Sequence, residues 1–170
     1  MMDQRMVDAI NKQINAELWS AYIYYAMAAW LEDNDLPGMA TWMKAQVQEE
    51  LFHADKFFGF VAERGGRVVL SPIDDPGKDW DSAAAVFKQA YEHEQWVTGN
   101  INGLMDLAIE LKDHATASFL RWYVDEQVEE EANTSAIAQQ ISMVEGSASM
   151  FMLDRELGAR VFTPPAAAGE

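Results

Sequence analysis

The sequence predicts an all-α protein, a four-helix bundle with one long crossover connection and a short C-terminal fifth helix. Four long stretches of the chain contain no proline, and each is rich in the helix-forming residues Ala, Glu, Gln, Met and Leu. Apolar residues recur in each stretch at three- and four-residue spacing, which is typical of a helix with one buried face. All four stretches are far longer than a strand, which has about 5–6 residues.

The four predicted long helices cover approximately residues 3–32, 38–64, 81–112 and 114–145, and the fifth helix covers approximately residues 147–158. The five prolines lie outside these ranges. Short links make the first and second helices antiparallel neighbours, and likewise the third and fourth.

The link between the second and third helices differs because it runs from Gly65 to Trp80. An extended chain of this length can reach roughly 50 Å, whereas the second helix spans about 40 Å. The link can therefore return along the whole bundle, which would make the second and third helices parallel. In either direction the midpoints of the helices stay level.

Composition limits the classes of protein. The chain has 170 residues, 49% of them hydrophobic, which suits one domain; we expect residues 1–160 to form it and residues 161–170 to form a flexible tail. The net charge of −16 disfavours nucleic acid and anionic membranes as partners and favours cations. The absence of cysteine excludes disulfides, thiolate catalysis and iron–sulfur clusters. Without an apolar leader or spanning segment, we expect a cytoplasmic protein.

Polar side chains interrupt each apolar stripe near its middle. The interrupting residues are Glu17, Glu50, His53, Glu94, Gln127 and Glu130. Burying one unpaired carboxylate costs several kcal/mol, so four together rival a net stability of about 5–15 kcal/mol. Cations among the carboxylates would lower this cost, as would protonation of some of them.

Glu50 and His53 are three residues apart and therefore project from one helical face. This Glu-x-x-His spacing is used by di-iron carboxylate sites in helical bundles. Oxygen donors with one imidazole suit Fe(II) or Mn(II), and Glu50 is the expected bridging ligand. The alternative is coincidence, because Glu-x-x-His also arises by chance.

Other polar residues near this layer are open to more than one interpretation. Tyr24 lies near Glu17 on the same helix, where it can donate an electron or a hydrogen bond, or simply pack in the core. His93 and His114 are predicted to be surface residues rather than ligands. A second, wetter cation site is predicted from the set Glu49, Glu126, Glu129 and Glu130; the alternative is an acidic surface.

The chain resembles the bacterial non-haem ferritins. The matching stretches are NAELWS at 15–20, QEELFH at 48–53, YEHEQ at 91–95 and FLRWYVDEQVEEE at 119–131. The resemblance implies a ferroxidase that oxidises Fe(II) with dioxygen or peroxide, and a cage of 24 subunits that stores ferric mineral. It also implies that Tyr24 is the tyrosine beside the centre.

The resemblance implies specific ligands as well. The first iron is assigned to Glu17, Glu50 and His53. The second is assigned to Glu50, Glu94 and Glu130, with Gln127 close by. A third iron site is assigned to Glu49, Glu126, Glu129 and Glu130.

Two departures separate the chain from bacterioferritins. Gln127 and Glu130 stand where those proteins have a second Glu-x-x-His, and Leu51 stands where they have a haem-binding methionine. We therefore expect no haem. Two other hypotheses remain: a protein that buffers metal without a fast oxidase, and a smaller di-iron enzyme that handles oxygen without storing iron.

Overall fold

The computed structural model describes residues 2–165, and within these residues it contains five helices and no strand. They are α1 (Gln4–Asp33), α2 (Pro37–Glu63), α3 (Ala83–Glu110), α4 (His114–Val144) and α5 (Ser149–Leu157). The predicted fold class is confirmed. Among these helices, none is both long and apolar enough to cross a membrane. The flexible tail predicted for 161–170 stays a prediction, and residues 166–170 lie outside the described part.

The helices begin where the local chemistry favours it. At three starts a side-chain oxygen accepts a hydrogen bond from a backbone amide of the first turn; the residues are Asp3, Ser82 and Asp113. Helix α2 instead begins at Pro37, whose missing N–H would have no partner in the first turn anyway.

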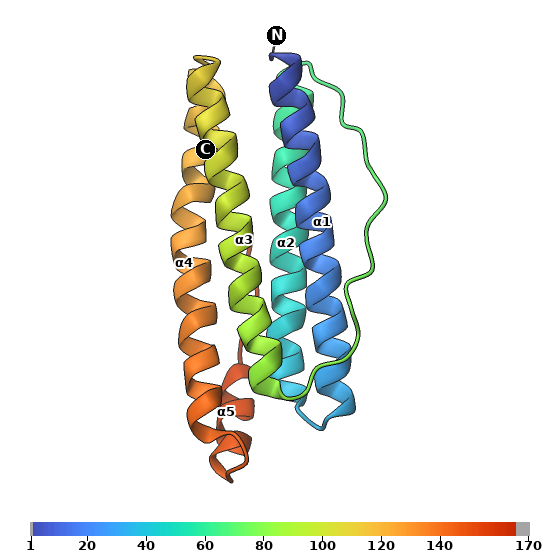
Figure 1. Cartoon of the computed structure of the whole chain (residues 1–170), viewed down its shortest axis with the longest axis vertical. Coiled ribbons are helices and arrows are strands. Elements are labelled where there is room, and N and C mark those ends of the chain that lie inside the picture. Colours follow the sequence, from blue (N-terminus) through green and yellow to red (C-terminus); the bar gives the residue numbers. More distant parts are fainter. Residues whose placement is uncertain (1, 166–170) are drawn as a thin grey trace.

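The crossover connection has the predicted path. Figure 1 shows it leaving the end of α2, running down the outside of α1 and entering α3, so that α2 and α3 are parallel. Asn11 of α1 holds this link in place. Its Nδ2 donates to the carbonyl of Arg67 at 3.0 Å, and its Oδ1 accepts from the amide of Val69 at 3.1 Å.

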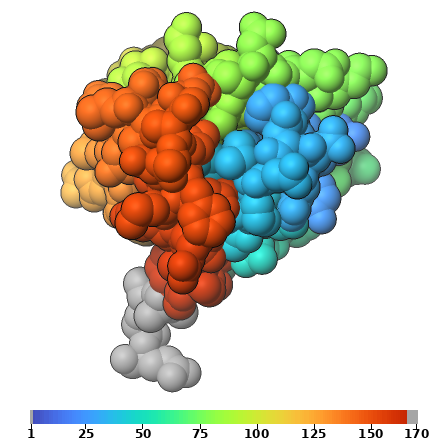
Figure 2. Space-filling model, turned by 90° about the horizontal axis from the view of Figure 1, so that it is seen from below, coloured from blue at the N-terminus to red at the C-terminus, as the bar shows by residue number. Residues whose placement is uncertain are grey.

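Helix α5 lies across one end of the bundle, against α2 and α4 (Figure 2). The buried carboxylate of Asp154 accepts hydrogen bonds from the amides of Gly38 at 3.1 Å and Met39 at 2.8 Å. It thereby satisfies two free N–H groups at the start of α2. A Cβ atom at Gly38 would lie 1.8 Å from the carbonyl oxygen of Asp154, so only glycine permits this approach.

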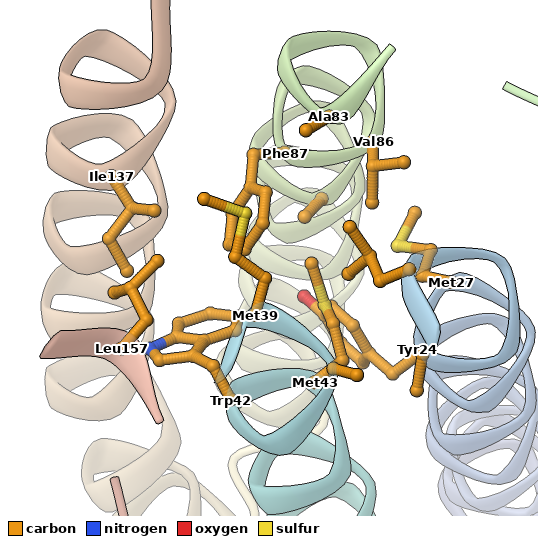
Figure 3. Packing of buried hydrophobic residues seen from close by; sticks show 14 of the residues in the cluster. Tyr24, Met27, Met39, Trp42, Met43, Ala83, Val86, Phe87, Ile137 and Leu157 are labelled. Carbon is orange, nitrogen blue, oxygen red and sulfur yellow. The ribbon is translucent and has the colours of Figure 1, made fainter. Parts of the chain in front are cut away.

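The apolar core consists of two clusters, one at each end of the bundle. Figure 3 shows the cluster nearer α5, to which α1 contributes Tyr24, α2 contributes Met43 and α3 contributes Phe87. The other cluster includes Ile10, Phe57 and other residues from the opposite halves of the four long helices. Between the two clusters lies a layer of buried polar side chains, at the level where the sequence interrupts its apolar stripes.

Candidate metal centre

All six residues that interrupt the apolar stripes are buried in one layer. Their side chains belong to four different helices, and none is more than 4% exposed: Glu17, Glu50, His53, Glu94, Gln127 and Glu130. Each occupies the inward face of its helix because it continues the three- and four-residue spacing of the apolar residues around it. A chance error in helical phase would leave at least some of them at the surface.

Glu17, Glu50 and His53 form a compact group. Each offers one ligand atom, and these atoms all lie within 4.8 Å of one another. His53 Nδ1 lies 3.4 Å from Glu50 Oε2. One carboxylate oxygen of Glu17, one of Glu50 and the Nε2 atom of His53 are buried without a hydrogen-bond partner. Buried polar atoms are normally paired, so this donor set fits a hard or borderline cation.

Glu94 completes the other side of the layer. The hydroxyl of Tyr24 donates a hydrogen bond to Glu94 Oε1, and Gln127 Nε2 donates to Glu94 Oε2 at 3.2 Å. Tyr24 is itself fully buried, so it both packs in the core and orients a carboxylate. Within the described residues, neither Glu94 nor Glu130 belongs to a group of three ligand residues whose atoms lie within 4.8 Å of one another.

Burial makes these carboxyl groups hold protons near neutral pH. The pKa of Glu17 is raised to about 8, first by burial and then by the negative charge of Glu50. The pKa of Glu94 is also raised to about 8, by burial and by Glu130, against the hydrogen bond from Tyr24. The pKa of Glu50 lies well above its usual range, chiefly because of burial. Binding of a cation would therefore displace protons from this layer.

Two glutamines to which the sequence analysis assigned no role also support the centre. Gln13 Nε2 donates to Glu17 Oε1 at 2.9 Å, and Gln46 Nε2 donates to Glu130 Oε2 at 2.8 Å. The signal that could have identified them is spacing. Gln13 precedes Glu17 by four residues, as Gln46 precedes Glu50, and residues four apart share a helical face.

The predicted second cation site stays a prediction, and the structure brings two of its four residues together with His53. Glu49, Glu126 and His53 each offer a ligand atom, and these atoms lie within 4.8 Å of one another; we call these three residues the outer group. Glu129 is exposed and does not belong to it. Burial and the charge of Glu130 raise the pKa of Glu49 to about 7, although Arg160 opposes the shift.

Arg160 also contacts the outer group. Its Nη2 donates to Glu49 Oε2 at 2.6 Å. No sequence signal identifies this contact, because it depends on where the chain goes after α5.

The expectation of a surface position was correct for His114 and wrong for His93. His93 is only 6% exposed, and its Nε2 lies 2.8 Å from the hydroxyl of Ser20. Its ring packs against Trp19, with 5.2 Å between ring centroids, and against Trp96, with 5.5 Å. Burial lowers the pKa of His93 to about 4, so the ring is neutral at physiological pH. The aromatic residues of α1 and α3 cover a position that periodicity placed off the inward stripe.

Comparison with known proteins agrees with this architecture. A family model described as a ferritin-like domain matches residues 7–144. A bacterial non-heme ferritin of Bacteroides fragilis is 39% identical over 160 residues, which span 94% of this chain and 100% of that protein. One of Staphylococcus saprophyticus is 36% identical over 163 residues, spanning 95% of this chain and 98% of that protein.

Solved structures show the same similarity. An engineered closed form of the Archaeoglobus fulgidus ferritin superimposes with a TM-score of 0.94 at 47% identity, covering 96% of this chain and 100% of that one. A structure described as a novel open pore ferritin from the same archaeon gives a TM-score of 0.92 at 47% identity, covering 94% of this chain and 98% of that one. With its helices, its buried carboxylate layer and these matches over nearly its whole length, the chain belongs to the ferritin family.

Proposed function

We propose that this protein is an iron-storage ferritin with ferroxidase activity. It oxidises Fe(II) to Fe(III) at the buried carboxylate layer and stores the ferric product as mineral inside a cage of 24 copies. The observation that carries the proposal is the buried group of Glu17, Glu50 and His53, whose ligand atoms lie within 4.8 Å of one another between two apolar clusters. Membership of the ferritin family supports it.

The substrate iron would occupy two adjacent positions. One Fe(II) takes Glu17, Glu50 and His53 as ligands, and the other takes Glu50, Glu94 and Glu130, so that Glu50 bridges them. Gln127 stands beside the second position as a neutral amide that holds Glu94. Oxygen ligands favour Fe(III) over Fe(II), because a hard anionic set stabilises the higher charge, and this assists the oxidation.

Two Fe(II) ions together supply the two electrons that the oxidant accepts. Each Fe(II) loses one electron, and dioxygen accepts both electrons together with two protons to give hydrogen peroxide. If peroxide is the oxidant, its O–O bond breaks, and two electrons and two protons give two molecules of water. The protein contributes a dry site with fixed donors, in which Gln13 and Tyr24 hold two of the carboxylates in place.

Self-assembly is supported by an exposed apolar surface on α1 and α2. Tyr22, Tyr25 and Leu51 are each about half exposed and line one groove together with Val47 and Ile73. Contiguous apolar surface of this kind marks protein contacts. The chain is also similar to structures described as open-pore and closed ferritins. The cytoplasmic location stays a prediction from the sequence.

One experiment separates this proposal from its rivals. Fe(II) is added aerobically to the metal-free protein, and ferric absorbance and particle mass are measured on the same sample. We expect rapid oxidation by a particle of 24 subunits. Oxidation as slow as in buffer, by a particle of that mass, would indicate a metal-buffering cage. Rapid oxidation by a small particle would indicate a di-iron enzyme that does not store iron.

Two variants test the site itself. Glu50→Ala and His53→Ala each remove a ligand and should slow the initial oxidation by about tenfold or more, the equivalent of 1.4 kcal/mol in the barrier. Glu92→Ala is the matched control, because Glu92 is an exposed glutamate two residues from Glu94. Initial rates equal to those of the unchanged protein in both site variants would refute the assignment.

A further inference from the structure

The chain turns between α4 and α5, and after α5 it continues along α2 toward the middle of the bundle as a non-helical segment (Figure 1). This segment carries Arg160 to the outer group. Arg160 Nη2 donates to Glu49 Oε2 at 2.6 Å, and the guanidinium lies 4.3 Å from the centre of the Trp42 ring. Two residues later, Phe162 packs against Phe52, with 6.0 Å between ring centroids.

The position of Arg160 is built into the fold. The segment starts from α5, whose Asp154 is hydrogen-bonded to the first turn of α2. The side chain of Arg160 is only 22% exposed, and that of Glu49 only 12%. A charge-assisted hydrogen bond shielded from solvent in this way is stronger than an exposed ion pair.

The outer group also has a feature that points to a cation. His53 belongs both to the outer group and to the inner group with Glu17 and Glu50. Its Nε2 atom is buried without a hydrogen-bond partner, and the residue is 2% exposed. One ring nitrogen of His53 lies within 4.8 Å of a carboxylate oxygen of Glu49 and of Glu126, while its Nδ1 lies 3.4 Å from Glu50 Oε2 on the inner side. The one positive charge that contacts Glu49 in residues 2–165 is the guanidinium of Arg160.

We propose that Arg160 is a built-in competitor for the outer cation site, and that it thereby determines how many irons the centre retains. This inference rests on the proposed function. The guanidinium is hydrogen-bonded to an oxygen of Glu49 that a third iron would need as a ligand. Its positive charge also repels an iron ion at that position. A third iron enters only when Arg160 withdraws. With Arg160 in place, the centre holds the two inner irons tightly, and the outer group binds a third only weakly.

The test is anaerobic Fe(II) binding to the intact assembly, measured by isothermal titration calorimetry. The unchanged protein should show two tight sites per subunit and a weaker third. In Arg160→Gln the third site should be about tenfold tighter, equivalent to 1.4 kcal/mol, while the two tight sites keep their affinity. Arg160→Lys should restore weak third-site binding because it keeps the charge. Arg155→Gln is the control, since it removes the same charge from an exposed position on α5.

The double variant Glu49→Gln/Arg160→Gln locates the effect. This double variant should not show the tighter third site of Arg160→Gln, because the tighter binding depends on the Glu49 carboxylate. The inference is overturned if Arg160→Gln leaves the third site unchanged or weaker, or if the gain persists in the double variant. Absence of the two tight sites in the unchanged protein would instead refute the proposed function. Circular dichroism and particle mass show whether each variant folds and assembles. If Arg160→Gln does not, Fe(II) titration of Glu49→Gln tests the outer site instead. Binding of a third Fe(II) by Glu49→Gln with the affinity of the unchanged protein would refute the outer site.

Discussion

The hydroxyl of Tyr24 donates a hydrogen bond to the carboxylate of Glu94, and so links α1 to α3 across the middle of the core. This bond orients the Glu94 carboxylate in the metal-free protein. The same bond favours the ionised form of Glu94, against the burial that raises its pKa. Tyr24 is thus both part of the apolar cluster shown in Figure 3 and part of the polar layer beside it.

Tyr24→Phe keeps the ring and removes the donor. We expect the proposed cage to assemble normally and the metal-free protein to lose about 0.5–1.5 kcal/mol of stability, the usual net contribution of a hydrogen bond between uncharged groups. Repeated additions of aerobic Fe(II) should show altered later turnovers. Tyr91→Phe is the control, because its hydroxyl contacts Gln95 in an exposed position. Unchanged multi-turnover kinetics would leave Tyr24 with a packing role only.

The stability of the metal-free protein should fall as pH rises from about 5 to about 8. The pKa of Glu17 is raised from 4.5 to about 8 in the folded chain. Between these values the folded state binds more protons than the unfolded state, so a rise in pH favours unfolding. Thermal unfolding of chelator-stripped protein at several pH values measures this effect.

A pair of variants isolates the contribution of Glu17 to that pH dependence. Glu17→Gln removes the titrating group and should flatten the dependence of the melting temperature on pH. Glu92→Gln changes the same charge at an exposed position and should not. Slopes equal to that of the unchanged protein in both variants would show that Glu17 does not contribute to the pH dependence.

Binding of Fe(II) should release protons. At pH 7 the carboxyl groups of Glu17 and Glu94 are largely protonated in the metal-free chain, since the pKa of each is raised to about 8. A metal ion needs the ionised form, so these protons must leave. Anaerobic calorimetry in two buffers of different ionisation enthalpy counts them. We expect fewer protons released at pH 9, and a count independent of pH would contradict the expectation.

The docking of α5 should depend on Gly38. Gly38→Ala would place a Cβ atom 1.8 Å from a backbone oxygen of Asp154, which forces α5 away from α2. We expect destabilisation of about 1–3 kcal/mol or more, as in other overpacked sites. Gly59→Ala is the matched control within α2, because nothing lies within 4 Å of its added Cβ; it should stabilise the helix by about 1 kcal/mol. Chemical denaturation of both variants measures these changes in the free energy of unfolding.

The sequence by itself determined the helices, the crossover and the buried layer. Periodicity is a local property, and it placed Glu17, Glu50 and Glu94 on the inward faces of their helices, as the structure has them. The length of the link between α2 and α3 allowed the parallel arrangement that Figure 1 shows. The resemblance to ferritins then supplied roles for the residues that periodicity had brought together.

Only the tertiary structure decided which side chains meet at the edges of that layer. It buried His93 beneath the aromatic residues of α1 and α3, placed His53 with Glu126, and returned Arg160 to Glu49. These contacts join residues that are far apart in the chain and belong to different elements. Periodicity within one helix does not specify the distance between two elements. Helical spacing specifies the face on which a side chain lies, but its reach to another element depends on how the helices and the returning C-terminal segment pack.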